Sequence, residues 1–454
     1  MAAGASRLFS CYYGFMRKIF DFEIHSKYSR ACSLALDLPN LHKWSQRKGV
    51  DIIGTGDFTH PKWFAEIQEQ LEQQDNGLLK LKKEFLPKDS RSSSANGSGA
   101  APGPQFILSA EISSIYSHNG KTRRIHNLLL APSIDAVKKI IAALQAKGAK
   151  LASDGRPIVG IPSKELLRLV LEVSEYCMLI PAHVWTPYFG LFGSMSGYDS
   201  VEECFEDLSP HVYALETGLS ADPEMFWRIS QFDRFTLVSC SDPHSLPRIG
   251  RECNVFDLRD EQVSYAELTR ILRQKDSEKF KYTLEYWPEE GRYHYDGHRD
   301  CKVSLHPNQT AKLPKNSKGQ ALCPKCGTPL TIGVLSRTEQ LSDRPQGYKL
   351  KGAIPSKHFV MLEEIIAAAL GKGVASKKVQ DEYLRMTANN SEIDILLELP
   401  ETELAKLTSA EVTEAILKVR SGQIEITPGY DGEYGKIKMF EKAQKIQATA
   451  SLFD

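Results

Sequence analysis

The segment IFDFEIH (residues 19–25) is the first of seven short apolar runs, each of which carries an acid or a histidine at or near its end. The other six are VDIIGTGDFTH (50–60), FILSAE (106–111), RIHNLLL (124–130), YCMLIPAH (176–183), VYALETG (212–218) and FTLVSCSDPH (235–244). Such runs are typical of buried strands. Parallel strands of a barrel direct their carboxyl ends to one rim, so the series predicts a metal site there.

Segments with apolar residues at three- and four-residue spacing lie between these runs, and they predict helices. Five examples are residues 38–49, 61–73, 133–148, 163–175 and 222–230. Strands that alternate with helices predict an α/β fold with a mostly parallel sheet. Seven such units favour closure into a β/α barrel, which we assign to residues 20–285.

Composition limits the remaining organisation. The 454 residues allow two or three domains, and the equal totals of 57 basic and 57 acidic residues neither favour nor exclude a nucleic-acid partner. No apolar stretch approaches the roughly 18 residues of a membrane span, so we expect a cytoplasmic protein without a membrane partner. Residues 1–19 are interpreted as an N-terminal extension, and the Ser- and Gly-rich stretch at 88–104 as a flexible insertion.

The polar residues of the seven runs are suitable ligands for two or three divalent metal ions. Imidazole and carboxylate together suit Zn, Mn or Fe, whereas Mg prefers oxygen alone. Such ions lower the pKa of a bound water and neutralise phosphoryl oxygens, which suits hydrolysis of a phosphate ester. For His126 and His183 the alternative is a buried core histidine, and Glu216 is equally suited to binding a metal or supporting a neighbour. The predicted ligands are Glu23, His25, Asp57, His60, Glu111, His126, His183, Asp242 and His244, with catalytic roles for Asp242, His183 and Glu111.

The order of these motifs resembles the polymerase-and-histidinol-phosphatase (PHP) superfamily over about residues 19–280. The resemblance implies a distorted seven-stranded β/α barrel with two or three metals. PHP proteins usually begin with His-x-His, whereas Glu23 stands here at the first histidine position. A further histidine expected a few residues later is absent, and Arg30 and Ala31 stand there. The superfamily includes phosphatases, so this resemblance alone leaves the substrate open.

A small zinc-binding module is predicted at residues 286–350. Cys323 and Cys326 have the spacing of a zinc knuckle, and His298 and Cys301 supply a second pair upstream. A single CxxC could instead be redox-active, and His294 or His306 could replace His298 as the fourth ligand. We expect one structural zinc ion that folds a module with little core of its own.

The whole chain resembles the endonuclease Q family of PHP-type DNA repair nucleases. The resemblance rests on DFEIHSKYSRACS, DIIGTGDFTHPKW, IPAHVWTPYFGLFGSMSGYDS, YHYDGHRDCKVSL, CPKCGTPLTIGV and PGYDGEYG. It implies a nuclease that recognises deaminated bases (uracil, hypoxanthine, xanthine) or abasic sites and cuts 5′ to the lesion. Other repair or replication proteins would be further partners, and residues 351–454 would form a helical DNA-binding region.

Two sets of side chains are candidate DNA contacts. The aromatic residues that follow His183 could stack on an extruded base, or could instead pack on neighbouring loops. Four basic residues could contact phosphates, although surface charges of this kind are usually only solvated. The candidates are Trp185, Tyr188, Phe189 and Phe192, and Lys27, Arg30, Arg337 and Arg344.

Two other functions compete with the endonuclease hypothesis. A PHP-type small-molecule phosphatase would not need a second domain, so residues 286–454 argue against it. A non-catalytic DNA-binding protein with a PHP barrel would be expected to lack motif residues, yet most ligand positions are filled. The chain has no G-x-x-x-x-G-K-[ST] phosphate loop, which excludes a helicase function based on that motif.

Overall fold

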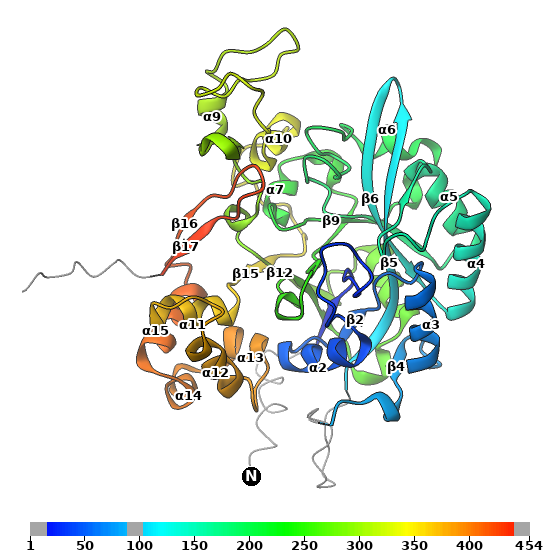
Figure 1. Ribbon diagram of the computed structural model, residues 1–454, viewed down its shortest axis with the longest axis vertical. Helices are drawn as coiled ribbons and strands as arrows, with labels where there is room; N and C mark the ends of the chain where they lie inside the picture. Colours follow the sequence, from blue (N-terminus) through cyan, green and yellow to red (C-terminus); the bar gives the residue numbers. More distant parts are fainter. Residues whose placement is uncertain (1–15, 89–102, 440–454) are drawn as a thin grey trace, which may run out of the picture.

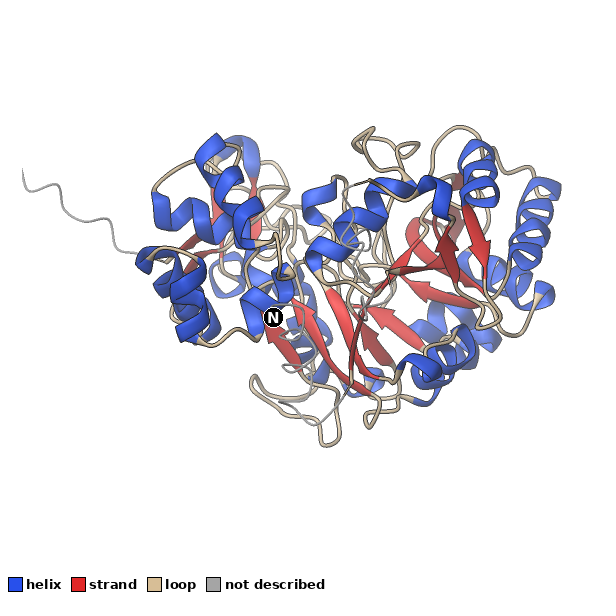
Figure 2. Cartoon of the chain, turned by 90° about the horizontal axis from the view of Figure 1, so that it is seen from below, coloured by secondary structure: helices blue, strands red, loops and turns tan. Residues whose placement is uncertain are grey.

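The computed structural model describes residues 16–88 and 103–439. A large lobe contains the central strands with helices packed around them, and a smaller, mostly helical lobe lies beside it (Figures 1 and 2). The predicted extension at 1–19 and the insertion at 88–104 fall mainly outside the described residues. The first strand begins at Arg17, so the last residues of the predicted extension belong to the sheet.

All seven predicted runs contain a strand. Phe20 of the first strand pairs in parallel with Ile52 of the second, and Ile53 pairs in parallel with Phe106 of the third. The sixth and seventh also pair in parallel, from Ala214 opposite Thr236 onward. The seven strands are β1 (Arg17–Asp21), β2 (Ile52–Gly54), β5 (Gln105–His118), β6 (Lys121–Ala131), β8 (Met178–Pro181), β9 (Ala214–Glu216) and β10 (Thr236–Val238).

One strand runs against the predicted direction. β5 and β6 form a long antiparallel hairpin, paired from Leu108 opposite Ala131 to His118 opposite Lys121 (Figure 1). Its turn consists of Asn119 and Gly120, which both have positive φ, and an Asn-Gly pair is the preferred two-residue hairpin turn. His126 therefore lies in the middle of a strand rather than at its carboxyl end. It still lies at the rim, because β6 starts at the turn that ends β5, so the part of β6 that contains His126 pairs with the later part of β5.

The predicted helices are confirmed. Asp37, Ser133 and Asp222 cap three of them by accepting hydrogen bonds from backbone N–H groups of the first turn. Each of these helices turns its apolar residues toward the strands, as the spacing predicts. The helices are α2 (Leu38–Lys48), α3 (Pro61–Gln70), α4 (Ile134–Ala146), α5 (Ser163–Val173) and α7 (Pro223–Trp227).

The large hydrogen-bonded sheet includes strands beyond those of the seven runs. It contains both parallel and antiparallel pairs, whereas the sequence predicts a mostly parallel sheet. β11 (Cys253–Asp257) pairs antiparallel with β1 and with β12 (Phe280–Glu285), and β15 (Ser356–His358) pairs in parallel with β12. β9 and β10 form a separate two-stranded sheet. Loop contacts link β9 and β10 to the larger sheet, including Val184 N to Glu216 O at 3.1 Å and Asp242 N to Glu23 O at 3.1 Å. The fold is therefore mixed α/β, and its central strands enclose a core. Closure into a seven-stranded barrel remains a prediction, and the name barrel region below refers only to residues 20–285, to which that prediction applies.

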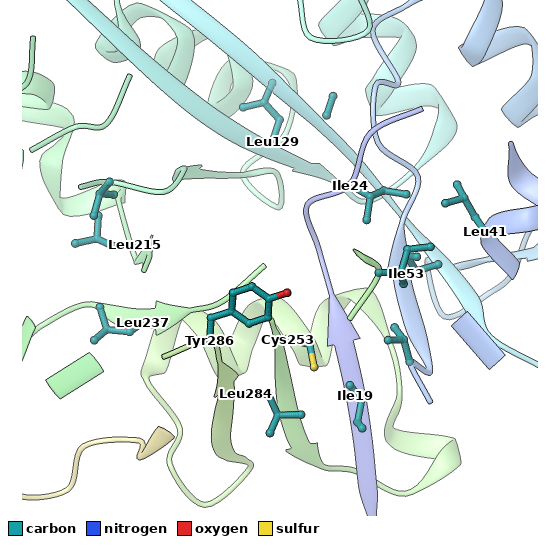
Figure 3. Close-up of a cluster of buried hydrophobic side chains, with 14 of the residues drawn as sticks. Ile19, Ile24, Leu41, Ile53, Leu129, Leu215, Leu237, Cys253, Leu284 and Tyr286 are labelled. Carbon is teal, nitrogen blue, oxygen red and sulfur yellow. The ribbon is translucent and has the colours of Figure 1, made fainter. Parts of the chain in front are cut away.

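That core gathers apolar side chains from strands far apart in the sequence. Ile19, Ile53 and Leu129 come from three strands of the large sheet, and Leu215 and Leu237 come from the separate pair (Figure 3). All five are buried. Their burial supplies the apolar contact that holds the strand ends in place around the rim.

The part of the chain after β12 contains three small structures. A hairpin of β13 (Asp296–His298) and β14 (Val303–Leu305) is followed by α9 (Pro307–Thr310) and α10 (Val334–Leu341). A second hairpin, β16 (Glu425–Thr427) and β17 (Lys436–Lys438), comes last among the described elements. Between them lie the C-terminal helices α11 (Leu362–Leu370), α12 (Lys377–Met386), α13 (Glu392–Leu397), α14 (Glu401–Leu407) and α15 (Ala410–Arg420).

A buried ion pair joins the C-terminal helices to the barrel region. Lys48, at the end of α2, lies 2.5 Å from Glu392 of α13, and both side chains are almost fully buried. Glu392 also accepts hydrogen bonds from Tyr383 Oη at 2.6 Å and Leu362 N at 3.0 Å. The carboxylate therefore links α2, α11, α12 and α13 at one point.

A Lys48→Met substitution is expected to lower the free energy of unfolding by about 3–5 kcal/mol, because it leaves the charge of Glu392 buried without its partner. Urea denaturation followed by circular dichroism would measure the loss. A Lys48→Met, Glu392→Leu double variant should lose less stability than the single variant. An equal or larger loss in the double variant would contradict this account.

Within the described residues, no helix combines the length and apolar character that a membrane crossing needs.

Candidate metal centre and adjoining cavity

Three overlapping groups of candidate metal-ligating atoms, named at the end of this paragraph, lie at the rim of the strands, and a further group of Glu23, Glu216 and Cys240 overlaps them through Glu23. In each group the candidate ligand atoms are within 4.8 Å of one another. The structure therefore brings together seven of the nine predicted ligands. The groups are Glu23, His25, Glu111 and Asp242; Glu111, His126 and His183; and His25, Asp242 and His244.

Glu111 at the centre of β5 connects the groups. Its Oε2 lies 3.5 Å from His25 Nε2, and its Oε1 lies 3.2 Å from His183 Nε2. His25 Nε2 is also 2.8 Å from Asp242 Oδ1, and His126 Nδ1 is 3.1 Å from His183 Nε2. This spacing suits ions that share a carboxylate.

The backbone makes sharp turns where these strands end. Asp57, His183 and Asp242 have φ values of 45°, 28° and 40°, which side-chain-bearing residues adopt rarely. Strained backbone of this kind is concentrated at functional sites. The close approach at His183 also requires Gly218, since a Cβ there would lie 2.6 Å from His183 Cβ.

Asp57 occupies a different position from the other carboxylates. It accepts hydrogen bonds from Ser26 N at 2.7 Å and Ser29 Oγ at 2.8 Å, and lies 3.4 Å from His25 Nδ1. Burial opposes its ionisation, but hydrogen bonds from His25 and Ser26 outweigh burial and lower the pKa of Asp57. It contacts the ring nitrogen of His25 remote from Asp242, the position of a carboxylate that orients a ligating histidine.

His60 also lies to one side of the three groups. It is the residue before α3, and its ring stacks on Tyr28 with centroids 4.5 Å apart. Burial lowers the pKa of His60, which favours the neutral imidazole. Its role as a ligand remains a prediction.

Several buried oxygens at the rim have no protein partner. Both carboxylate oxygens of Glu23, and Oε1 of Glu216, are buried without a hydrogen bond. Burial, together with the neighbouring carboxylates of Glu216 and Glu111, raises the pKa of Glu23 well above its usual value. Unpaired buried carboxylates are costly, and bound cations would relieve both the desolvation and the repulsion. The donor set therefore fits divalent metal ions.

The two histidines of the second group have pKa values shifted in opposite directions. Burial lowers the pKa of His126 to about 4, so its ring is a neutral donor. Burial opposes the charge of His183 as well, but Glu111 outweighs it and raises the pKa of His183 to about 9. Glu216 Oε2 accepts a hydrogen bond from His183 N at 2.7 Å, so Glu216 supports the turn that carries this histidine.

Arg156 is a site residue that sequence reasoning missed. Its Nη1 lies 3.0 Å from Glu111 Oε2, and its side chain is about one-quarter exposed toward the cavity described below. A single arginine in a loop carries no motif, and the flanking Gly155 and Pro157 predict only a turn. Only the tertiary structure places this charge beside the candidate ligands.

A cavity of about 610 Å³ opens directly onto the candidate metal ligands. His126, His183, Asp242 and His244 line one side of it. The other walls come from distant parts of the chain, namely Arg248, Glu290, Arg292, Tyr293, Val334, Glu364 and Tyr434. The barrel region, the module after it and the C-terminal segment all contribute to this one cavity.

The four predicted aromatic contacts separate into two pairs. Trp185 and Phe192 are buried, and they pack with Phe226 and Phe232 in the core. Trp185 nevertheless lines the cavity described above, and base stacking by these two residues remains a prediction. Phe189 is half-buried, lines the cavity and lies 4.5 Å from the His126 ring. Tyr188 is half-buried, and its hydroxyl lies 3.3 Å from Thr331 Oγ1.

A Trp185→Ala substitution is expected to cost about 3–5 kcal/mol of folding free energy, because it leaves a large cavity among packed aromatic rings. Chemical denaturation at fixed metal concentration would measure the change. Phe189→Ala is the matched control, and it should be much less destabilising because Phe189 is only half-buried. Unchanged stability in the Trp185 variant would show that its ring does not support the core.

The predicted phosphate contacts are also mostly engaged within the protein. Arg337 donates to the carbonyl oxygens of Phe192 and Tyr198, both at 2.9 Å, and Arg344 donates to Asp233 at 2.8 Å. These two arginines hold α10 and the segment after it against the barrel region, and their assignment as phosphate contacts remains a prediction. Lys27 and Arg30 remain predictions. Lys27 pairs with Glu66 at 2.9 Å, and the Arg30 side chain is 86% exposed.

The four predicted zinc ligands, His298, Cys301, Cys323 and Cys326, form one group with their donor atoms within 4.8 Å. A hydrogen bond to Thr328 lowers the pKa of the Cys326 thiol to about 6, which favours the thiolate. The apolar core nearby is small and consists of Val303, Ala321, Cys323 and Leu330. Three sulfurs and one imidazole nitrogen fit a tetrahedral structural zinc.

Comparisons with known proteins find relatives of this chain in sequence and in fold. A family model described as the MJ0043 C-terminal domain matches residues 361–423, which include the C-terminal helices. An uncharacterised protein of Methanocaldococcus jannaschii, MJ0043, is 33% identical over 58% of this chain, and the match spans about a third (32%) of that relative's length. An uncharacterised protein of Bacillus subtilis, YqxK, is 28% identical over 93% of this chain and all of its own length.

Two solved structures match most of the chain. The lesion-specific endonuclease PfuEndoQ from Pyrococcus furiosus is 28% identical, with a TM-score of 0.78 over 95% of this chain and 98% of that one. An endonuclease Q complex with duplex DNA that carries an abasic lesion at the active site is also 28% identical, with a TM-score of 0.79 over 95% of this chain and 100% of that one. The predicted resemblance is confirmed across both lobes.

Proposed function

Because the chain resembles the endonuclease Q family in sequence and fold along nearly its whole length, we propose that it is a metal-dependent DNA endonuclease. Its substrates are duplexes with a deaminated base (uracil, hypoxanthine or xanthine) or an abasic site. It hydrolyses the phosphodiester bond 5′ to the lesion. The observation that carries the proposal is the cavity, which combines candidate metal ligands with walls from three parts of the chain.

The size of the cavity suits one extruded nucleotide. At about 610 Å³ it falls within the range of pockets that enclose small ligands, about 300–1,000 Å³. An enzyme that reads a base inside a duplex must first extrude it, and a damaged or missing base lowers that cost. A nucleotide in this cavity would bring the adjacent phosphate to the rim where Glu111 and Asp242 lie.

The residues at the rim have separate roles in hydrolysis. Glu23, His25, Glu111, His126, His183, Asp242 and His244 would hold two or three divalent ions. Bound there, such ions make hydroxide available near neutral pH and neutralise charge on the phosphate. Asp57 orients His25 through its Nδ1. Arg156 gives a fixed positive charge beside Glu111, where a scissile phosphate oxygen would approach.

The module after the barrel and the C-terminal helices would position the duplex. We assign one structural zinc to His298, Cys301, Cys323 and Cys326, which would fold the module around its small core. A small-molecule phosphatase would have no need for cavity walls from these regions. Their contribution to the cavity favours a large substrate.

The direct test uses end-labelled duplexes that contain a single uracil, hypoxanthine, xanthine or abasic site. Incubation with Mg²⁺, Mn²⁺ or Zn²⁺ should produce one nick 5′ to the lesion, with 3′-hydroxyl and 5′-phosphate ends. An undamaged duplex of the same sequence, and reactions with EDTA, are the controls. Absence of a nick with every lesion and every metal would refute the proposal.

A further inference from the structure

The motif PGYDGEYG (428–435) forms the turn between β16 and β17, and it reaches the cavity. From the sequence we interpret it only as a turn that anchors the C-terminal segment. In the structure, Tyr434 and Gly435 line the same cavity as the candidate metal ligands. The hairpin lies between the C-terminal helices and the α9–α10 region (Figure 1).

Two glycines allow this hairpin to lie directly against the chain that follows β12. Gly429 N donates to Glu289 O at 2.8 Å, and Gly435 N donates to Glu290 O at 2.9 Å. A Cβ on Gly429 would lie 2.3 Å from Gly291 O, and one on Gly435 would lie 2.2 Å from Glu289 O. No other residue type fits at these two positions without a backbone shift. The turn is therefore held in one position on the cavity wall.

Asp431 holds the tip of the turn on the predicted zinc module. Its carboxylate accepts hydrogen bonds from Arg299 N and from Thr331 Oγ1, both at 2.7 Å. Asp431 has φ of 44°, so the chain reverses sharply at this residue. The hairpin is thus fixed at its base and at its tip, and the side chains between these points are held in place.

Tyr434 is the exposed aromatic side chain of this fixed turn. It lines the cavity and is nevertheless 49% exposed. The guanidinium of Arg292 lies 5.2 Å from its ring centroid, and Arg292 Nε donates to Gly432 O at 2.8 Å. A cation over part of the ring holds the ring in position, while about half of the side chain remains accessible.

We propose that Tyr434 determines substrate specificity by stacking on the base of the extruded nucleotide. A fixed aromatic ring is sequence-tolerant, since every base offers a π-face. The inference rests on the proposed function and deepens it, because it separates lesions that retain a base from lesions that lack one. Uracil, hypoxanthine and xanthine would gain from the contact, whereas an abasic site offers no ring to stack on.

The test compares Tyr434→Ala with Tyr434→Phe on hypoxanthine and abasic duplexes. Loss of one stacking contact should weaken hypoxanthine-duplex binding and kcat/KM by about 5- to 100-fold. The ratio of hypoxanthine to abasic affinity should fall by the same factor, and the Phe variant should stay close to the unaltered protein. Fluorescence anisotropy at fixed salt without a chelator, with each variant and the unaltered protein also carrying Asp242→Asn, measures binding independently of cleavage and leaves the zinc of the module in place. Tyr176→Ala is the control, since Tyr176 is similarly exposed but precedes β8 at the opposite strand ends.

Equal losses on the two duplexes, or no loss on hypoxanthine, would overturn the role in base stacking. A Phe variant as weak as the Ala variant would also overturn it, because the ring would then not be the active feature. Damage-specific binding without cleavage by the unaltered protein would refute the endonuclease activity. In that case the binding ratio still decides the role of Tyr434.

Discussion

An Asp242→Asn variant is expected to lose lesion cleavage by about 1,000-fold or more, and to bind fewer metal ions at the rim. Asp242 belongs to two of the three candidate ligand groups, and its Oδ1 lies 2.8 Å from His25 Nε2. Asparagine keeps the size of the side chain but removes the negative charge. Nicking kinetics would measure the loss of activity, and inductively coupled plasma mass spectrometry would measure the metal content.

A matched control is available on the surface. Asp135 has a side chain that is 83% exposed on α4, and Asp135→Asn should cleave and bind metals as the unaltered protein does. The Asp242 variant should retain the zinc assigned to the downstream module, so its metal content should fall without reaching zero. Full cleavage activity in the Asp242 variant would contradict its place in the metal centre.

The second large effect is expected from a Cys323→Ser substitution, which should remove one zinc ion per chain and unfold the module that contains it. Zinc binding supplies about 10–16 kcal/mol of apparent folding free energy in small zinc domains. The core around Cys323 is too small to replace that contribution. Zinc content, and susceptibility of residues 296–333 to limited proteolysis, would measure the effect.

The loss of this module should extend to the cavity. Thr331 and Arg299 hold Asp431 at the tip of the β16–β17 hairpin, so an unfolded module releases one of its two attachments. We therefore expect weaker binding of damaged DNA in the Cys323 variant, with the rim metals still bound. Cys177→Ala is a control for thiol removal, because Cys177 is buried in the barrel region away from the zinc group. Unchanged zinc content in the Cys323 variant would refute the ligand assignment.

Sequence reasoning anticipated which side chains would lie close together where the candidate ligands follow strands. Glu23-Ile-His25 and Asp242-Pro-His244 each lie at one strand end, so local periodicity was enough to pair them. His126 lies at the site for a different reason. The Asn119-Gly120 turn makes β6 antiparallel to β5, so His126 does not follow the carboxyl end of a strand. The zinc group was predicted by short-range spacing within two pairs, which a tetrahedral metal requires.

The burial of the candidate DNA contacts could not be predicted from the sequence, since burial of an aromatic or basic side chain depends on what packs over it. Trp185 and Phe189 lie four residues apart in one loop and both line the cavity, yet Trp185 is buried against Phe226 and Phe192 while Phe189 is only half-buried. Arg337 resembles a surface cation in the sequence, but α10 places it against the carbonyl groups of the 192–198 segment. No local pattern distinguishes these outcomes.

The sequence by itself determined which residues end each strand, which helices lie between the strands and which four side chains could share a zinc ion. These features depend on local periodicity and short spacing, so they can be read from neighbouring residues. Only the tertiary structure decided that Arg156, Arg292 and Tyr434 border one cavity with His183 and Asp242. Those residues come from loops and a turn up to hundreds of positions apart, and their meeting depends on how the module and the C-terminal hairpin dock on the barrel region.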